Sequence, residues 1–143
     1  MPSPTSPWSY SADHISPDGR YRATVAEACE IGMGAPTSGT LLISDSFHGG
    51  RVHVRLEACS PSFVWSSDSR ALAVPQWTPS LQQRLTIVSL PSGTVRPVAQ
   101  EFRVLELRSF ERGMVLGVDS PVYMPRSFEF SVADLIESDA GTA

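Results

Sequence analysis

The spacing of the prolines is the sequence feature that most limits how this chain can fold. Twelve prolines are distributed along the 143 residues, so no long stretch is free of them before the C-terminal tail. Proline lacks an amide hydrogen and clashes with the preceding helical turn, which excludes long helices. Between the prolines lie short runs of β-branched and aromatic residues, the pattern typical of strands. The sequence therefore predicts an all-β protein, an antiparallel meander of about ten short strands.

The predicted strands belong to an internal repeat. Asp18 matches Asp68 and Arg20 matches Arg70, 50 positions later in each case, and the strands that follow each turn match as well. A third, weaker copy keeps the strand pattern but has no aspartate turn. We therefore expect two to three copies of one antiparallel unit. The predicted strands are residues 20–26, 39–44, 52–56, 62–65, 71–74, 84–89, 94–98, 104–110, 114–119 and 127–132.

The two good turns carry a resemblance to a known repeat. Ser16-Pro17-Asp18-Gly19-Arg20 and Trp65-Ser66-Ser67-Asp68-Ser69-Arg70 resemble the turn (W/F)-S-P-D-G-(R/K) of β-propeller blades of the TolB-like, WD-repeat-like and prolyl-oligopeptidase types. The resemblance implies blades in which the aspartate caps the turn and the glycine adopts a positive φ, so that Ser69 fits its position less well than Gly19. Closed propellers have about four to eight blades. We therefore expect a partial propeller or an open sheet stack or sandwich, either monomeric or closed as a homodimer.

The repeats also suggest how the chain is organised. We expect residues 1–13 to be an extended N-terminal segment, residues 14–132 to be a single all-β repeat domain, and residues 133–143 to be a C-terminal tail. Only residues 132–139 have the pattern of a helical turn. The side chains expected in the core are Phe63, Trp65, Leu72, Val74, Ile87, Val104, Leu116 and Phe130.

Composition limits the partners and the compartment. All eleven basic residues are arginine, and the absence of lysine and asparagine is typical of a GC-rich genome, which favours a bacterial source. A net charge of −4 argues against a nucleic-acid backbone or an anionic membrane as partner and favours a basic protein. The N-terminus lacks the pattern of a signal peptide, and no apolar stretch approaches the ~20 residues needed to span a bilayer. We therefore expect a cytoplasmic protein.

The residues that carry chemistry do not form a catalytic or metal-binding pattern. Asp13, His14 and Ser16 are triad residue types, but neighbouring side chains on an extended chain point in opposite directions. His48 and His53 have no cysteine or carboxylate at zinc-ligand spacing. We therefore predict no enzymatic activity, no metal and no cofactor; the alternative is a small hydrolase or metal-dependent enzyme in which His14, His48 and Asp45 converge.

The two cysteines, Cys29 and Cys59, are too few for a disulfide scaffold. We expect both to be buried free thiols.

Aligned repeats place three insertions at equivalent positions, residues 28–38, 75–83 and 120–126, each between the second and third strand of its unit. In stacked units, equivalent loops lie on one rim, which is often the binding face of a repeat protein. For Trp77 and Tyr123 the alternative is that the ring folds back onto the core. The predicted partner-binding residues are Glu27, Glu30, Met33, Trp77, Tyr123, Met124 and Arg126.

These observations favour a non-catalytic protein-binding module. Its size, acidity and lack of catalytic machinery resemble, at the level of a class, the small bacterial immunity proteins that bind a cognate toxin and block its active site. Glu27 and Glu30 are the acidic groups expected to face a basic toxin domain. The alternative from a different class is a scaffold that completes a propeller by self-assembly.

Overall fold

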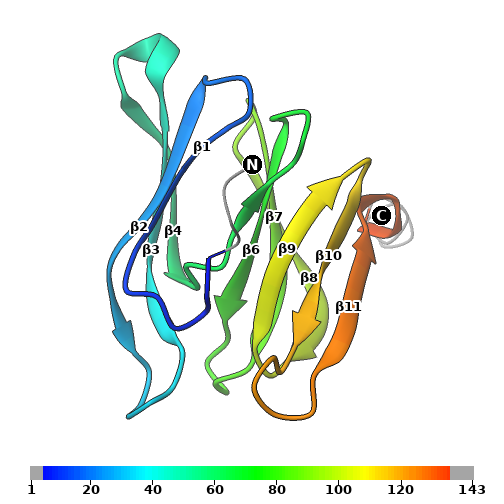
Figure 1. The fold of residues 1–143 in the computed structure, drawn as a ribbon. Coiled ribbons are helices and arrows are strands. Elements are labelled where there is room, and N and C mark those ends of the chain that lie inside the picture. The colour runs from blue at the N-terminus through cyan, green and yellow to red at the C-terminus, as the bar shows by residue number, and fades with distance from the viewer. Residues whose placement is uncertain (1–4, 136–143) are drawn as a thin grey trace.

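The computed structural model describes residues 5–135, and Figure 1 shows them as three antiparallel sheet units standing side by side. The first unit consists of β1 (Ala12–Ile15), β2 (Tyr21–Glu30), β3 (Thr37–Asp45) and β4 (Arg51–Cys59), with the short 3-10 helix η1 (Ser46–His48) before β4. The second consists of β5 (Val64–Trp65), β6 (Ala71–Trp77), β7 (Gln83–Ser89) and β8 (Thr94–Phe102). The third consists of β9 (Leu105–Glu111), β10 (Met114–Asp119) and β11 (Arg126–Ser131).

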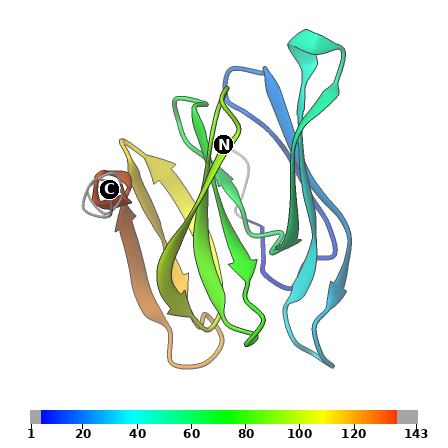
Figure 2. The same ribbon diagram turned by 180° about the vertical axis from the view of Figure 1, so that it is seen from behind.

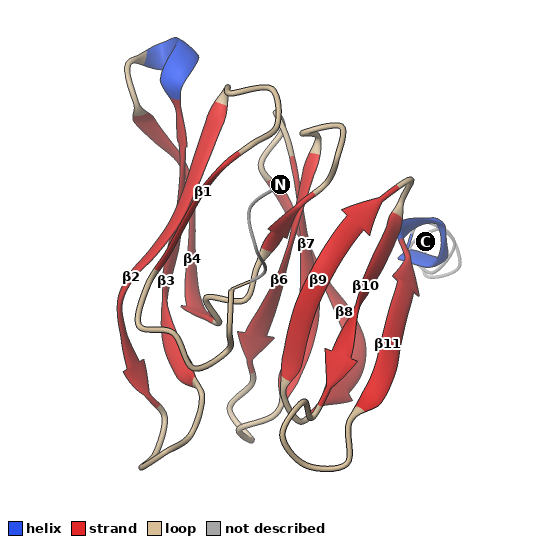
Figure 3. Cartoon of the chain, in the orientation of Figure 1, coloured by secondary structure: helices blue, strands red, loops and turns tan. Residues whose placement is uncertain are grey.

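The all-β prediction is confirmed. One bridge, between Cys59 of β4 and Gln76 of β6, joins the first two units into an eight-stranded sheet, and the third unit is a separate three-stranded sheet. Within the described residues neither sheet closes into a ring, as the view from behind in Figure 2 also shows. Figure 3, coloured by secondary structure, shows how little of the chain is helical.

The core consists of two apolar layers on either side of the second unit. Leu72, Val74 and Val88 contact the first unit, where Val25, Leu41 and Ile43 are fully buried. On the other face, Ala73, Leu85 and Ile87 pack against Leu105, Leu107 and Val115 of the third unit. Strands β6 and β7 are thus buried on both faces, which is why their apolar residues run almost without interruption.

The two aspartate turns have the same hydrogen bonds. In the first, the Ser16 hydroxyl donates to Asp18 and the Arg20 amide donates to the same carboxylate oxygen. In the second, the Ser66 hydroxyl and the Arg70 amide donate to Asp68 in the same way. Ser69 adopts a φ of 64° where Gly19 has 78°. The Ser69 hydroxyl oxygen accepts a hydrogen bond of 2.9 Å from the Asp18 amide. This serine therefore has a strained backbone in its own turn and also links the two turns to each other.

The expected core is largely correct, with one error. Phe63, Leu72, Val74 and Ile87 are buried, Trp65 and Phe130 are partly buried against the core, and Val104 is half-buried. Leu116, in contrast, is 43% exposed. Residues 114–118 are apolar on both faces apart from Gly117, so the sequence does not reveal that Val115 faces the second unit and Leu116 faces away from it.

Strand β1 was not among the predicted strands. It has no run of β-branched residues and exists through its pairing with β2, where Ala12 lies opposite Val25. Two prolines also lie inside strands rather than at their ends. Pro97 is in β8, an outer strand with one neighbour, and Pro75 is in β6 opposite Leu85.

Both ends of the described chain pack onto the sheets. Pro7 O accepts a hydrogen bond from the Thr37 amide and Tyr10 O accepts one from the Ala28 amide, so the segment before β1 runs along the first unit. Residues 132–135 are helical, and Leu135 is buried in the layer between the second and third units. Residues 1–4 of the expected N-terminal segment and 136–143 of the expected tail lie outside the described residues. Within residues 5–135, no helix is both long and apolar enough to cross a bilayer.

Gly117 is the glycine with the least space for a side chain. The pairing of β9 and β10 shifts register between Leu116 and Gly117, and a Cβ at Gly117 would lie 2.3 Å from the backbone oxygen of Glu106. We predict that Gly117→Ala lowers the free energy of unfolding by about 3 kcal/mol, measured by urea denaturation. Gly32→Ala is the control, since the nearest heavy atom is 3.9 Å away. Equal stability of the two variants would refute the close approach.

The Ser69 turn allows a second prediction. Ser69→Ala keeps the strained φ and removes the hydroxyl that accepts from Asp18, so it should destabilise the fold by about 1 kcal/mol. Ser69→Gly loses the same hydrogen bond but relieves the backbone strain, so it should cost less. Thermal and urea denaturation of both variants measure the order. A more stable alanine variant would contradict this account.

Candidate partner-binding rim

Three turns lie together at one end of the stack, at the bottom of Figure 1. They are residues 31–36 between β2 and β3, residues 78–82 between β6 and β7, and residues 120–125 between β10 and β11. We call this end the hairpin rim. The predicted insertions do occupy equivalent positions of the three units, although the strands extend further into them than expected. The 3-10 helix η1 is at the opposite end.

The hairpin rim exposes large apolar side chains on all three of its turns. Met33 is fully exposed on the first turn, and Leu81 is 60% exposed on the second. The third turn exposes Val122, Tyr123 and Met124, each by about two thirds or more. These exposed side chains are not part of either apolar layer of the core.

The first turn is held by the N-terminal segment. The Tyr10 hydroxyl donates to Glu30 at 2.7 Å, the Gly34 amide donates to the same carboxylate at 3.1 Å, and the Trp8 indole donates to Gly34 O at 3.0 Å. The bond from Tyr10, aided by the one from Gly34, lowers the pKa of Glu30, and the same pairing raises the pKa of Tyr10. Glu27 is exposed at a bulge in β2, where its φ is 56°.

Trp77 does not contribute its ring to the surface of the rim. Only 9% of the residue is exposed, and its indole donates a hydrogen bond of 3.1 Å to Thr37 O in the first unit. Of the two alternatives for this residue, the core position is the one observed. Trp77 therefore links two units beneath the turns and is not part of the candidate contact surface.

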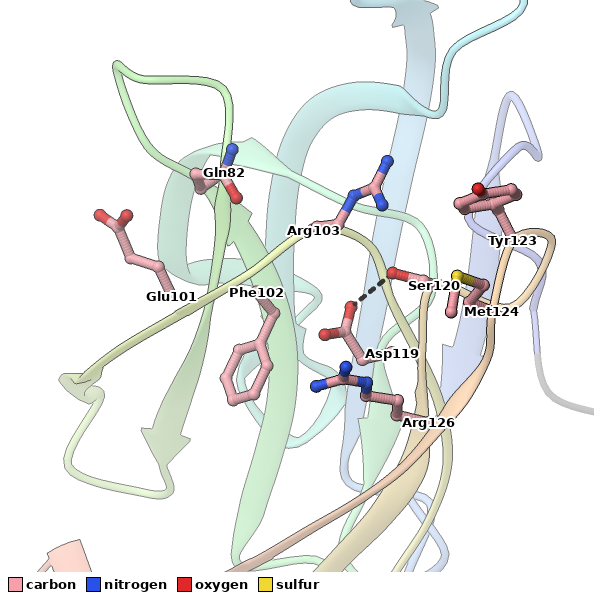
Figure 4. Close-up of a pocket in the computed structure, with 9 residues that line it drawn as sticks. All are labelled: Gln82, Glu101, Phe102, Arg103, Asp119, Ser120, Tyr123, Met124 and Arg126. Carbon is pink, nitrogen blue, oxygen red and sulfur yellow. Dashed lines mark hydrogen bonds between the residues drawn. The ribbon is translucent and has the colours of Figure 1, made fainter.

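The third turn forms one side of a pocket of about 330 Å³, shown in Figure 4. The pocket lies where the ends of β8 and β10 meet the start of β11. It brings Tyr123, Met124 and Arg126 together, whereas Glu27, Glu30 and Met33 belong to the hairpin of the first unit. The lining residues are Gln82, Glu101, Phe102, Arg103, Asp119, Ser120, Tyr123, Met124 and Arg126.

Sequence reasoning did not single out the exposed rim residues Leu81 and Val122, or the pocket residues Glu101, Phe102, Arg103 and Asp119. Leu81 lies within a predicted insertion but was not singled out, although it is the large apolar residue of its turn. Glu101, Phe102 and Asp119 lie at strand ends, and Arg103 lies in the connection between β8 and β9. In an antiparallel unit the connection from the last strand to the next unit reaches the same end as the second turn, and that topological signal was available from the repeats.

The three residues of the enzymatic alternative, His14, His48 and Asp45, do not form one cluster. His48 lies 3.7 Å from Asp45, but His14 contacts the Thr5 hydroxyl at 2.7 Å and the Phe63 ring instead. Within residues 5–135, no three histidine, cysteine or carboxylate side chains form a group that could hold a metal ion. Asp45 is used structurally, since its carboxylate pairs with Arg20 at 3.2 Å and accepts from the Phe47 amide.

The prediction for the cysteines is half correct. Both are free thiols, but Cys29 is exposed because it follows the bulge in β2, whereas Cys59 is fully buried. Burial raises the pKa of Cys59 to about 12, so this thiol is not a nucleophile at neutral pH.

Comparison with solved structures finds a similar fold in the acylaminoacyl peptidase of Pyrococcus horikoshii, a protein that has a β-propeller domain. The TM-score is 0.51 at 16% sequence identity, and the match covers 70% of this chain and 16% of that chain. The likeness is one of fold. It agrees with the blade-like turns and implies nothing about activity, because this chain spans a small part of the peptidase. No family model and no curated protein matches the sequence.

The different environments of Trp77 and Tyr123 are testable by stability. Trp77→Ala should lower the free energy of unfolding by about 3–5 kcal/mol, since it removes a buried ring and leaves Thr37 O without its donor. Tyr123→Ala should change it by less than about 0.5 kcal/mol, because that side chain is 65% exposed. Urea denaturation of both variants checks this. Similar losses would mean that Tyr123 also supports the core.

Proposed function

We propose that this chain is a non-catalytic protein-binding module and that the hairpin rim is its contact surface. The observation that carries the proposal is the exposure of Met33, Leu81, Val122, Tyr123 and Met124 on three turns of one rim. Methionine and tyrosine are enriched at protein interfaces, and exposed apolar side chains grouped on one face mark interaction sites.

The turns are ordered before any partner binds. Glu30 fastens the first turn to Tyr10 and Gly34, and the second turn is closed by bonds between Thr78 and both Leu81 and Gln82. Prolines 36, 79, 121 and 125 restrict the backbone of all three turns. A contact surface that is already ordered loses less conformational entropy on binding, which supports a recognition role for these loops.

The particular case that we favour is an immunity protein that binds a basic toxin domain and covers its active site. The overall acidity and the exposed Glu27 and Glu30 support this choice, because opposite charges accelerate association. The Glu27 carboxylate is more available to a partner, since the Glu30 carboxylate already accepts hydrogen bonds from Tyr10 and Gly34.

The outer faces of the stack argue against ring closure by a second copy. The outward side of the first unit carries the ion pairs of Asp13 with Arg22 and of Arg55 with Glu57. The outward side of the third unit carries the pair of Glu106 with Arg108. Packing these faces against each other would bury charges at a desolvation cost that their attraction does not generally recover.

The proposal predicts a stable complex with the product of a neighbouring toxin-like gene, measured by gel filtration and titration calorimetry. The double variant Met33→Arg, Tyr123→Arg should weaken binding by about a hundredfold or more, because it places charge in an apolar contact. Phe47→Arg is the control, since Phe47 is 70% exposed at the opposite end of the stack.

Three outcomes contradict the proposal. The absence of a complex removes the immunity role, and an equal effect of Phe47→Arg moves the contact away from the hairpin rim. Elution of the chain alone at twice its mass would indicate self-assembly instead. Glu27→Gln tests the charge argument separately, because it should slow association at low salt and change little at 0.5 M salt.

A further inference from the structure

Two of the residues that line the pocket of the hairpin rim are arginines. Arg103 follows β8 and Arg126 begins β11, and both line the pocket. Within residues 5–135, neither guanidinium pairs with a carboxylate, whereas Arg20, Arg22, Arg55 and Arg108 all do. The contact of Arg103 is with the Tyr123 ring, 5.9 Å from the guanidinium carbon to the ring centre.

Asp119 also lines the pocket, and its carboxylate is engaged by a backbone amide and a hydroxyl. Its Oδ1 accepts from the Val104 amide at 3.2 Å and from the Ser120 hydroxyl at 3.3 Å. The Ser120 amide in turn donates to Val104 O at 2.8 Å. Asp119 therefore fastens the third turn to the connection between β8 and β9. In Figure 4 its carboxylate lies between the Arg103 and Arg126 side chains.

The fourth charged group, Glu101, points out of the cluster. In Figure 4 its carboxylate is directed away from Asp119 and from both guanidinium groups. The lining is balanced in formal charge, but because Glu101 is directed away, Asp119 is the carboxylate of the lining that lies between the two guanidinium groups. A carboxylate matches the paired donors of a guanidinium that has no carboxylate partner.

The surroundings of the charges add an apolar requirement. Tyr123 and Met124 form an exposed edge, and the Phe102 side chain lines the opposite side in Figure 4. A free inorganic anion would leave these surfaces without contacts. A peptide group that carries both a carboxylate and an apolar side chain would use both parts of the pocket.

We propose that this pocket is a receptor for a peptide carboxylate, in which Arg103 and Arg126 bind the charge and Phe102, Tyr123 and Met124 bind an adjacent apolar side chain. This rests on the proposed function and names the chemistry of one anchor of the partner. The hairpin rim then has an acidic end at Glu27 and Glu30 and a carboxylate-binding end at the pocket. Such a pair of opposite contacts fixes the orientation of a partner.

Titration with small peptides tests the receptor without the partner. The readout is the arginine Nε–Hε signals in NMR spectra of the labelled chain. Acetyl-Phe-Phe with a free terminal carboxylate should shift the Arg103 and Arg126 signals and saturate in the millimolar range, whereas its terminal amide should not. Acetyl-Glu-Phe amide distinguishes the source, because saturation by it alone identifies a side-chain carboxylate as the ligand.

Variants link the binding to the two arginines. Arg103→Gln and Arg126→Gln should each weaken the binding of the carboxylate peptide by about tenfold. Arg51→Gln is the matched control, an exposed arginine at the other end of the stack that forms no ion pair with a described residue, and it should have no effect.

Four results would overturn the proposal: equal binding of the amide, no shift with either carboxylate peptide, stronger binding of inorganic phosphate than of the peptides, or an equal effect of Arg51→Gln. Failure of this titration leaves the partner complex standing, since formation of that complex is measured directly by gel filtration and calorimetry. Failure of the complex with success of the titration would keep the receptor and remove the immunity role.

Discussion

The structure depends on the burial of the second sheet unit on both of its faces. Strands β6 and β7 send Leu72, Val74 and Val88 to one side and Ala73, Leu85 and Ile87 to the other. A fully buried leucine or isoleucine contributes about 1.5–3 kcal/mol, so these two layers dominate the stability of a chain this small. Neither outer unit has a comparable second apolar layer. The outer units are therefore stable because the middle unit is buried between them.

This stacking also determines what the chain can present to a partner. Units that pack face to face place equivalent turns at the same end, so turns 31–36, 78–82 and 120–125 form one rim although they are far apart in the chain. Hydrogen bonds between the units fix the positions of the three turns relative to one another. Trp77 bonds to Thr37 across the first boundary, and Gln83 and Ser62 accept from the backbone of β9 across the second. The exposed side chains consequently sit on a rigid frame.

Much of this was predictable because the repeat relates distant residues without any knowledge of contacts. The matched turns at Asp18 and Asp68, the strand-rich pattern and the common end of the three insertions all follow from local turn chemistry and alignment. The errors occur where tertiary packing determines which face of a strand is buried or whether a strand forms. Leu116 lies in an apolar run whose inward face is set by the neighbouring unit, and β1 exists only through its pairing with β2.

The candidate site divides in the same way. Tyr123, Met124 and Arg126 were identifiable as turn residues, but Arg103 and Asp119 reach the same pocket from a connection and a strand end. The sequence likewise does not show whether a tryptophan beside a turn faces solvent or a neighbouring unit. Trp77 is buried against the first unit, where its indole donates a hydrogen bond to Thr37 O.

The sequence by itself determined the all-β class, the repeat and the position of the turns, because prolines, glycines and aspartates act on the backbone within a few residues. Only the tertiary structure decided that three units stack without closing, that Trp77 is internal, and that two arginines share a pocket. Those outcomes depend on which faces meet, and the interactions between faces join residues that are far apart in the chain.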